Sequence, residues 1–236
     1  MNDLTLQKAR AYEAEHGAAI TPAERPAYHM TPYVGWLNDP NGFSYYKGKY
    51  HQFYQYNPYD VRWAPMHWGH AVSSDLLHWE YLPCALAPDS PADNGPGCFS
   101  GSATEMDDGK QLLMYTSVIA EKQPNGEMRD IQTQSIAIGD GLDYEKPACN
   151  PVLTQKDLPE GFSKFDSGTP RSGVRPTAPT PPSPSALPRM AAAQRHCSRA
   201  RTASTGTLSR CWNAATISTA KCGSARTSSH WTANRS

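Results

Sequence analysis

From about residue 27 to residue 150, apolar and aromatic residues alternate with polar ones in short runs that turn-forming residues separate. The segment GFSYYKGKYHQFYQYN predicts a hairpin, with strands over 42–46 and 49–56 and a turn at Lys47-Gly48. HWGHAVSSDLLHWEYLP predicts a strand, a turn and a second strand. Short strands with a turn every 8–12 residues or so indicate an all-β sandwich, barrel or propeller.

The next two segments continue this pattern. CFSGSATEMDDGKQLLMYTSVI predicts a hairpin that turns at residues 107–109, and RDIQTQSIAIGDGLDYEKP predicts one more strand and a turn. The run DLLHWEYLP recurs loosely as DGLDYEKPACNPVL. A recurring outer strand of this kind is typical of repeated sheets, such as propeller blades, and two and a part of them fit into residues 27–166.

Three regions differ in composition. Residues 4–16 suit a short helix that Gly17 ends, so residues 1–26 form a predicted helical segment. Residues 27–166 form the predicted β-domain. Residues 167–236 hold no Asp or Glu, no Tyr and no Phe, and are rich in Ser, Thr, Ala, Arg and Pro. Composition alone predicts a disordered tail there.

The formal net charge of zero conceals a division along the chain. All 22 acidic residues precede residue 167, together with 12 of the 22 Lys and Arg, which leaves the tail with ten positive charges. One interpretation of the tail is a basic arm that binds nucleic acid. The other is an out-of-frame translation of GC-rich DNA.

The N-terminus lacks the apolar stretch of a secretory signal, and no apolar run reaches transmembrane length. Six cysteines at spacings that match no zinc or CxxC pattern are interpreted as reduced thiols. Together these features predict a cytoplasmic protein with no membrane partner.

The candidate catalytic and binding residues lie in and after the stretch GWLNDPNGF, residues 35–43. Asn, Asp, Pro and Gly in close succession usually form a turn, and the plain interpretation of Asp39 is a turn or cap residue. However, YHQFYQYNPYDVRWAPMHWGHAVSSDLLHW follows, which places amides beside many aromatic rings. Sugar sites combine such groups, because rings cover the C–H faces and amides bind the hydroxyls. For Trp68 and Trp79, packing in the core explains the residue as well as a role in a sugar site does.

Taken in order, WLNDPNG, QYNP, HWGHAVSSDLLHW and FSGS resemble the N-terminal half of the β-fructofuranosidases of glycoside hydrolase family 32. The resemblance runs from about residue 25 to Asp166, and HMTPYVGWLNDPNGF is a specific signature. It implies the first two to three blades of a five-bladed β-propeller. In the family, a β-sandwich follows the propeller.

The resemblance also implies roles for individual residues. Asp39 corresponds to the catalytic nucleophile. The residues expected to line the sugar subsite are Trp36, Asn38, Gln55, Trp63, Phe99 and Ser100. A retaining mechanism requires a second carboxyl group about 5–5.5 Å away. Asp39 must stay ionised, and backbone N–H groups that donate to it would favour that state. No metal or other cofactor is expected.

Two family motifs do not occur in this reading frame. One is RDP, whose Asp binds fructose hydroxyls, and the other is EC, whose Glu is the acid/base. Arg129-Asp130 is followed by Ile131, and Phe165-Asp166 is followed by SGTPRSG. Back-translation of SGTPRSG in a shifted frame permits Phe-Arg-Asp-Pro-Lys-Val-Trp. In the same frame, KCGSARTSSHWTA near residue 221 permits Met-Trp-Glu-Cys-Pro-Asp-Phe-Phe-Pro-Leu-Asp-Gly.

The sequence therefore predicts part of a cytoplasmic enzyme that hydrolyses sucrose or sucrose 6-phosphate and is inactive without its acid/base. The expected partner is a small sugar. A levan- or inulin-type fructan hydrolase is the nearest alternative. A non-catalytic fructan-binding propeller and a nucleic-acid binder with a basic tail are the others, although the shifted-frame motifs argue against the nucleic-acid binder.

The frameshift hypothesis predicts the nucleotide sequence around codons 160–175. We expect the codons after the one for Asp166 to read TCC GGG ACC CCA AGG TCT GGC, or synonyms that preserve the shifted reading. Sequencing the gene checks this. Wobble bases that forbid Arg-Asp-Pro in the shifted frame would refute the hypothesis.

Overall fold

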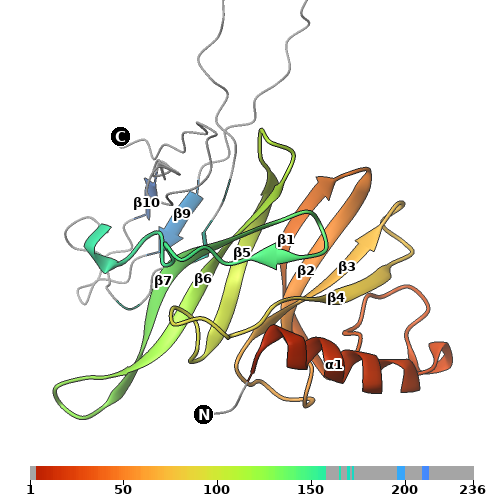
Figure 1. Cartoon of the computed structure of the whole chain (residues 1–236), viewed down its shortest axis with the longest axis horizontal. Coiled ribbons are helices and arrows are strands. Elements are labelled where there is room, and N and C mark those ends of the chain that lie inside the picture. Colours follow the sequence, from red (N-terminus) through yellow and green to blue (C-terminus); the bar gives the residue numbers. More distant parts are fainter. Residues whose placement is uncertain are drawn as a thin grey trace, which may run out of the picture. The chain divides into compact units, whose positions relative to one another are not determined.

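The computed structural model describes residues 4–157, residues 165, 169, 170 and 172, and the backbone of residues 196–199 and 209–212 (Figure 1). The chain divides into two compact units, Met1–Ser172 and Gly173–Ser236. The first unit carries the helices and two β-sheets, and the second carries one two-stranded sheet.

Two four-stranded antiparallel sheets form the body of the first unit (Figure 1). Within each sheet, strands that follow one another in sequence are neighbours. The first sheet consists of β1 (Trp36–Tyr46), β2 (Lys49–Asn57), β3 (His67–Ser73) and β4 (Glu80–Leu86). The second consists of β5 (Gly97–Glu105), β6 (Gln111–Lys122), β7 (Met128–Gly139) and β8 (Tyr144–Glu145). Four-stranded meanders are the units of β-propellers, so the predicted all-β class and blade-like sheets are confirmed.

The predicted hairpins are confirmed by their turns. Lys47 and Gly48 join β1 to β2, and both have positive φ angles, 47° and 81°. This pair of left-handed residues matches the twist of the strands that it connects. The β5–β6 turn lies at the predicted place, where the Gly109 amide donates to the Met106 carbonyl at 2.9 Å.

The loose repeat noticed in the sequence corresponds to equivalent turns in the two sheets. Before β4, the carboxylate of Asp75 accepts hydrogen bonds from the backbone amides of residues 77 and 78. Before β8, the carboxylate of Asp140 does the same for the amides of residues 142 and 143. The residue after each aspartate has a positive φ, 67° at Leu76 and 101° at Gly141. The two sheets are therefore variants of one structural unit.

The interpretation of NDPNG as a turn is wrong. Residues 38–42 lie inside β1, which runs without a break to Tyr46. Two irregularities in its pairing with β2 accommodate the unusual residues, one between Leu37 and Pro40 and one between Asn41 and Ser44. Proline lacks the amide needed in a regular ladder, but β1 is the edge strand of its sheet and Pro40 borders such a bulge, where proline is tolerated.

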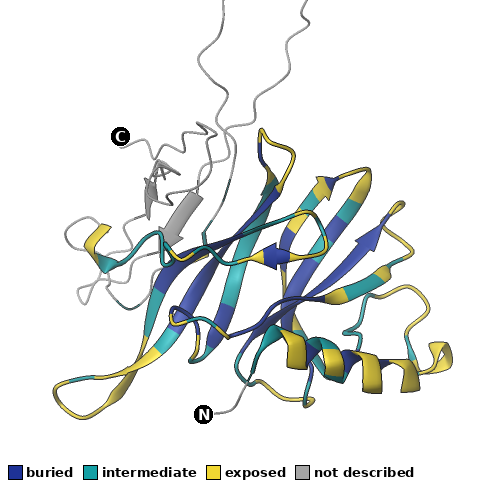
Figure 2. Cartoon of the chain, viewed as in Figure 1, coloured by how far each residue is buried: buried dark blue, intermediate teal, exposed yellow. Residues whose placement is uncertain are grey.

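The main core lies between the two sheets, whose facing residues are buried (Figure 2). It contains Phe53, Trp68, Ala85, Leu86, Cys98, Leu113, Tyr115, Ala137 and Tyr144. Trp68 is fully buried, which decides in favour of core packing for this tryptophan.

Helix α1 (Leu6–His16) confirms the predicted N-terminal helix, and the Thr5 hydroxyl accepts a hydrogen bond from the Lys8 amide at its start. The helix packs on β4, the outer strand of the first sheet. The Cys84 amide donates to the Glu13 carboxylate at 2.8 Å, and Arg10 Nε donates to the Cys84 carbonyl at 2.9 Å. Side chains of α1 thus satisfy both backbone groups of Cys84 in this outer strand.

Two short helical turns, Gly17–Ala19 and Pro22–Glu24, follow α1, and a third, Gln155–Asp157, follows the second sheet. The predicted boundaries of the β-domain, at residues 26 and 166, stay predictions. In the second unit, β9 (His196–Arg199) pairs antiparallel with β10 (Ser209–Trp212). The predicted disorder of the tail otherwise falls outside the described residues.

The cysteines and the helices bear on two further predictions. Cys84 and Cys98 are free, as predicted, and both are buried. Cys149 is disulfide-bonded, so the prediction of a reduced thiol is wrong there. Within the described residues, none of the helices has the length and apolar character that crossing a membrane requires.

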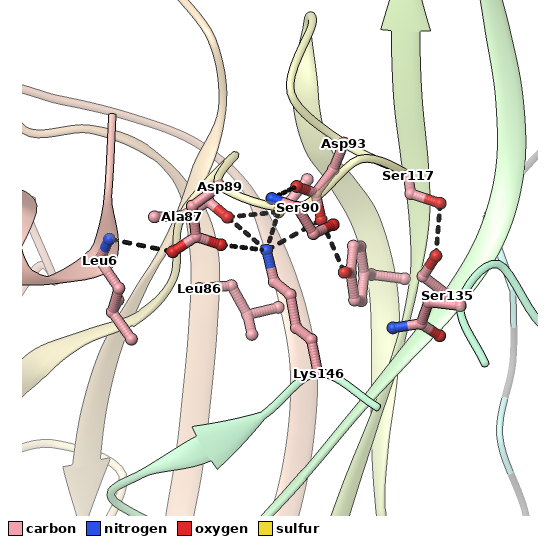
Figure 3. Close-up of polar contacts among 12 residues, drawn as sticks. Leu6, Leu86, Ala87, Asp89, Ser90, Asp93, Ser117, Ser135 and Lys146 are labelled. Atoms are coloured by element: carbon pink, nitrogen blue, oxygen red, sulfur yellow. Dashed lines mark hydrogen bonds and ion pairs between the residues drawn. The ribbon is translucent and has the colours of Figure 1, made fainter. Parts of the chain in front are cut away.

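A largely buried ion-pair network connects the segment between β4 and β5 with the second sheet (Figure 3). The Lys146 amino group lies 2.8 Å from Asp89 and 2.8 Å from Asp93, and it donates to the carbonyl of Ala87. Asp93, which is fully buried, also accepts from the Tyr115 hydroxyl at 2.8 Å. Burial acts to lower the pKa of Lys146, but its acidic neighbours outweigh burial and raise that pKa above its ordinary value.

Replacing Lys146 by Met should lower the free energy of unfolding by about 3–5 kcal/mol, because Asp93 would remain as a buried charge without its cation. Lys49→Met is a matched control, since Lys49 pairs with Glu80 at the surface, where an ion pair contributes about 0–1 kcal/mol. Urea unfolding followed by tryptophan fluorescence measures both. Equal losses in the two variants would contradict a special role for the buried network.

Candidate active site

Four of the predicted site residues lie in two equivalent bulges. In β1, Asn38 and Asp39 lie between Leu37 and Pro40, where the pairing with β2 shifts. In β5, Phe99 and Ser100 lie between Cys98 and Gly101, where the pairing with β6 shifts. β1 and β5 are the first strands of their sheets and pack against each other. A bulge takes residues out of the regular ladder and re-aims their side chains.

The two bulges meet through one hydrogen bond. Ser100 Oγ donates to Asp39 Oδ2 at 3.3 Å. The expectation that backbone amides would donate to Asp39 is wrong for the described residues, among which the donor is this hydroxyl. Asp39 itself is exposed, so a substrate can reach it.

Asn41, which was not among the predicted site residues, connects the two bulges through hydrogen bonds. In the amide orientation in which its oxygen faces hydrogen-bond donors, this oxygen accepts from Gln55 Nε2 at 2.9 Å. The amide nitrogen then donates to Ser100 Oγ at 3.3 Å. Asn41 is almost completely buried, which excludes competing water from these bonds. The sequence signal for Asn41 was its place as the second Asn of NDPNG, but the prediction of a turn there made it a loop residue.

Gln55 is the one predicted subsite residue that is buried beneath the site. Its Nε2 donates to the Cys98 carbonyl at 3.0 Å as well as to Asn41. The side chain therefore connects β2 and β1 in the first sheet with β5 in the second. In this arrangement Gln55 supports the residues that surround Asp39.

Two aromatic rings lie at the β5 bulge that also contains Ser100. Trp63, in the loop after β2, is 56% exposed and lies edge-on to Phe99, with ring centroids 6.5 Å apart. The backbone of Phe99 is held from inside, because Trp68 Nε1 donates to its carbonyl at 3.1 Å. An exposed indole next to a half-buried phenyl ring offers the apolar surface that a sugar ring covers.

Trp36 and Asn38 are the remaining predicted residues. Trp36 is half-buried at the start of β1 and pairs with Asn57, and Asn38 is exposed next to Asp39. Their side chains take part in none of the hydrogen bonds described above. The structure thus brings Asp39, Ser100, Phe99, Trp63 and Gln55 together and places the other two along the same strand.

The cysteine next to this site is not a second nucleophile. Burial raises the pKa of the Cys98 thiol well above its ordinary value, so this thiol stays protonated. Its role is to pack in the core between the sheets. Across the part of the chain that is described, no group of three or more His, Cys, Asp or Glu side chains could hold a metal ion. The chemistry available at the site is that of one carboxylate with a hydroxyl donor.

Replacing Asn41 by Ala should lower the free energy of unfolding by about 1–3 kcal/mol, because buried partners would lose their hydrogen bonds. Asn125→Ala is the control, since Asn125 lies exposed in the β6–β7 turn and its loss should change stability by no more than about 0.5 kcal/mol. Chemical denaturation measures both. Equal effects would contradict the role assigned to Asn41.

Comparison with known proteins identifies the family to which the chain belongs. Residues 29–165 match the family model described as the glycosyl hydrolases family 32 N-terminal domain. The sucrose-6-phosphate hydrolase of Zymomonas mobilis is 42% identical over 158 residues, which cover 66% of this chain and 30% of that protein. The levanase of Bacillus subtilis is 41% identical over 156 residues, which cover 65% of this chain and 22% of the levanase.

Among solved structures, a mutant of the Bombyx mori family 32 β-fructofuranosidase in complex with sucrose superimposes with a TM-score of 0.60 at 41% identity. The match covers 72% of this chain and 34% of that one. The chain thus covers between 22% and 34% of the length of these relatives. Since the family model matches more than half of its residues, the chain belongs to glycoside hydrolase family 32, and residues 29–165 match the N-terminal domain of that family.

Proposed function

We propose that this chain carries the nucleophile-bearing part of a retaining β-fructofuranosidase that acts on sucrose or sucrose 6-phosphate. The observation that carries the proposal is the meeting of the two bulges, in which the hydroxyl of Ser100, the neighbour of Phe99 in the chain, donates to the carboxylate of Asp39. The relatives named sucrose-6-phosphate hydrolase and β-fructofuranosidase support the same reaction.

In the proposed reaction, Asp39 attacks C2 of the fructosyl unit and forms a covalent intermediate. The hydroxyl of Ser100 orients this carboxylate, and Trp63 and Phe99 cover the apolar side of the sugar. Asn38 and Trp36 extend the subsite along β1. A second carboxyl group protonates the departing glucosyl oxygen and later deprotonates the attacking water.

The proposal includes the inactivity of this chain as it stands. Arg129-Asp130 lies in β7, where Asp130 pairs with Ala120 of β6, and the residues that follow do not form the RDP motif. The acid/base Glu is encoded, on our hypothesis, only in the shifted frame. An inactive family member is therefore the proposed state of this chain.

A fructan hydrolase is the second candidate. It is favoured by the levanase relative, whose identity to this chain nearly equals that of the sucrose-6-phosphate hydrolase. Both candidates use the same nucleophile and differ in the leaving group. A fructan-binding propeller without turnover is the remaining alternative.

Sucrose hydrolysis by this chain and by a frame-restored version tests the proposal. The restored protein should release glucose and fructose, and this chain should be slower by at least about 10²–10⁴-fold, because no acid protonates the leaving group. Sucrose 6-phosphate and levan, assayed in parallel, identify the preferred substrate.

In the restored protein, Asp39→Asn should abolish turnover, whereas Asp107→Asn, an exposed turn aspartate, should not affect it. Equal activity of the original and restored chains would refute the argument from the missing acid. Sugar binding without any turnover by the restored protein would favour the fructan-binding alternative.

A further inference from the structure

Two histidine rings are buried together where the first sheet meets the second. His51 of β2 is 5% exposed and His70 of β3 is fully buried, and Nδ1 of His51 lies 3.0 Å from Nε2 of His70. At this distance one ring donates a hydrogen bond and the other accepts it. We call these two residues the histidine pair. They are not among the residues of the candidate active site.

The second sheet encloses the histidine pair. The ring of Tyr144 in β8 meets His70 edge-on, with centroids 6.3 Å apart. The turn before β8 lies directly on His51, since a Cβ atom added to Gly141 would be 3.3 Å from Cε1 of His51. The two rings therefore stay out of water as long as this turn stays on the first sheet.

The hydrogen bonding of the histidine pair suits two uncharged rings. Nδ1 of His70 is buried and has no hydrogen-bond partner within the described residues. A protonated imidazole carries hydrogen on both nitrogens, so a charged His70 would bury an N–H group without an acceptor. If His51 takes the proton instead, His70 must accept at Nε2 and carry its own hydrogen at Nδ1, with the same result. Such an unsatisfied buried donor is costly.

Burial and nearby charges also oppose a proton on the histidine pair. Burial lowers the pKa of both rings, and it takes that of His70 well below its ordinary value. A backbone hydrogen bond with Tyr46 acts in the other direction at His51 but is outweighed. The cationic side chains that add to the effect of burial are Lys49, Lys47 and Arg10.

The carboxylates of this region are engaged elsewhere. Asp140 accepts from two backbone amides of its own turn. Asp143 forms an ion pair with Arg10 at 2.6 Å. Glu80 forms one with Lys49 at 2.8 Å. The tyrosines that meet the two rings, Tyr46 and Tyr144, donate their hydroxyls to other groups of the protein.

The histidine pair is connected to the candidate active site through one aromatic ring. Phe53 stacks on His70 with centroids 4.1 Å apart and meets Trp68 at 5.6 Å. Trp68 in turn donates to the Phe99 carbonyl in the β5 bulge. A movement at the histidine pair would therefore reach the bulge that contains Ser100 through two packed rings.

We propose that the histidine pair is an acid-sensitive joint between the two sheets. In mild acid both rings take up a proton and lose the hydrogen bond between them, and the turn before β8 leaves the first sheet so that water reaches the charged rings. Phe53 then loses the ring on which it stacks, and the β5 bulge loses the support of Trp68. The inference concerns the contact between the sheets and does not rest on the proposed reaction.

The direction of the pH effect follows from the uncharged state of the folded pair. An unfolded histidine has a pKa of about 6.5, so opening is coupled to proton uptake below that pH. The stability that the pair contributes is complete above about pH 6.5 and declines as the pH falls. Each ring that stays uncharged when folded raises the unfolding constant by about 25-fold between pH 7 and pH 5, so that both rings raise it by up to about 600-fold.

Urea unfolding of the full chain at pH 7 and pH 5, followed by tryptophan fluorescence, tests the inference. The double variant His51→Asn with His70→Gln replaces the rings by amides that can share a hydrogen bond but do not titrate. The rise in the unfolding constant should be at least about 25-fold smaller in this variant than in the original chain. His67, whose pKa burial lowers to about 4, is present in both chains and cancels from the comparison. His29→Gln, which removes an exposed ring, is the control and should leave the rise within about twofold.

Hydrogen exchange keeps the inference testable if the double variant does not fold. After correction for the intrinsic rate, the amides of residues 140–147 in the original chain should exchange faster at pH 5 than at pH 7, and should do so before the paired amides of β6 and β7. The single variant His70→Gln should show a smaller acceleration in that segment.

Three results would overturn the inference. An equal rise in the unfolding constant of the original chain and the double variant would show that the two rings cause no pH dependence. An equal acceleration of exchange in His70→Gln would show the same for the turn. Exchange of residues 140–147 that quickens only together with the whole chain would show that no local joint opens.

Discussion

The hydrogen bond from the Trp68 indole to the Phe99 carbonyl ties the two sheets together at the point where the candidate site forms. A bulge disturbs the ladder of its strand, and buried carbonyl groups at a bulge need donors from elsewhere. In β5 these donors come from the first sheet, since Trp68 serves the carbonyl of Phe99 and Gln55 serves that of Cys98. Without the first sheet beside it, the bulge that presents Ser100 would leave two carbonyl groups unsatisfied. The geometry of the site therefore depends on the contact between the sheets as much as on the strands that carry its residues.

Local patterns were enough to predict the hairpins. The Lys47-Gly48 turn, the turn before β6 and the Asp75 and Asp140 turns all arise from residues that are adjacent in sequence. The residue types at the site could also be recognised, because amides beside aromatic rings follow from the chemistry of sugar binding. Asp39, Ser100, Phe99, Trp63 and Gln55 do come together in space.

The bulges could not be predicted in this way. NDPNG has the composition of a turn, and only pairing with β2 on one side and packing against β5 on the other make it an edge strand. Asn41 was missed for the same reason, since its burial and its bonds to Gln55 and Ser100 exist only once both sheets are in place. The donor to Asp39 is likewise a side chain from the other sheet, where local reasoning had suggested backbone amides.

Helix α1 has a consequence for how the first sheet can grow. The outer strand of a sheet normally offers its amides and carbonyls to any strand that arrives, in the same molecule or in another. At Cys84 both groups are already taken, the amide by a carboxylate whose pKa burial raises and the carbonyl by a guanidinium. An incoming strand would have to break both bonds there and return Glu13 and Arg10 to water. The helix thus hinders the pairing of a further strand with β4. A strand added to the first sheet would pair more readily with β1, the other edge strand.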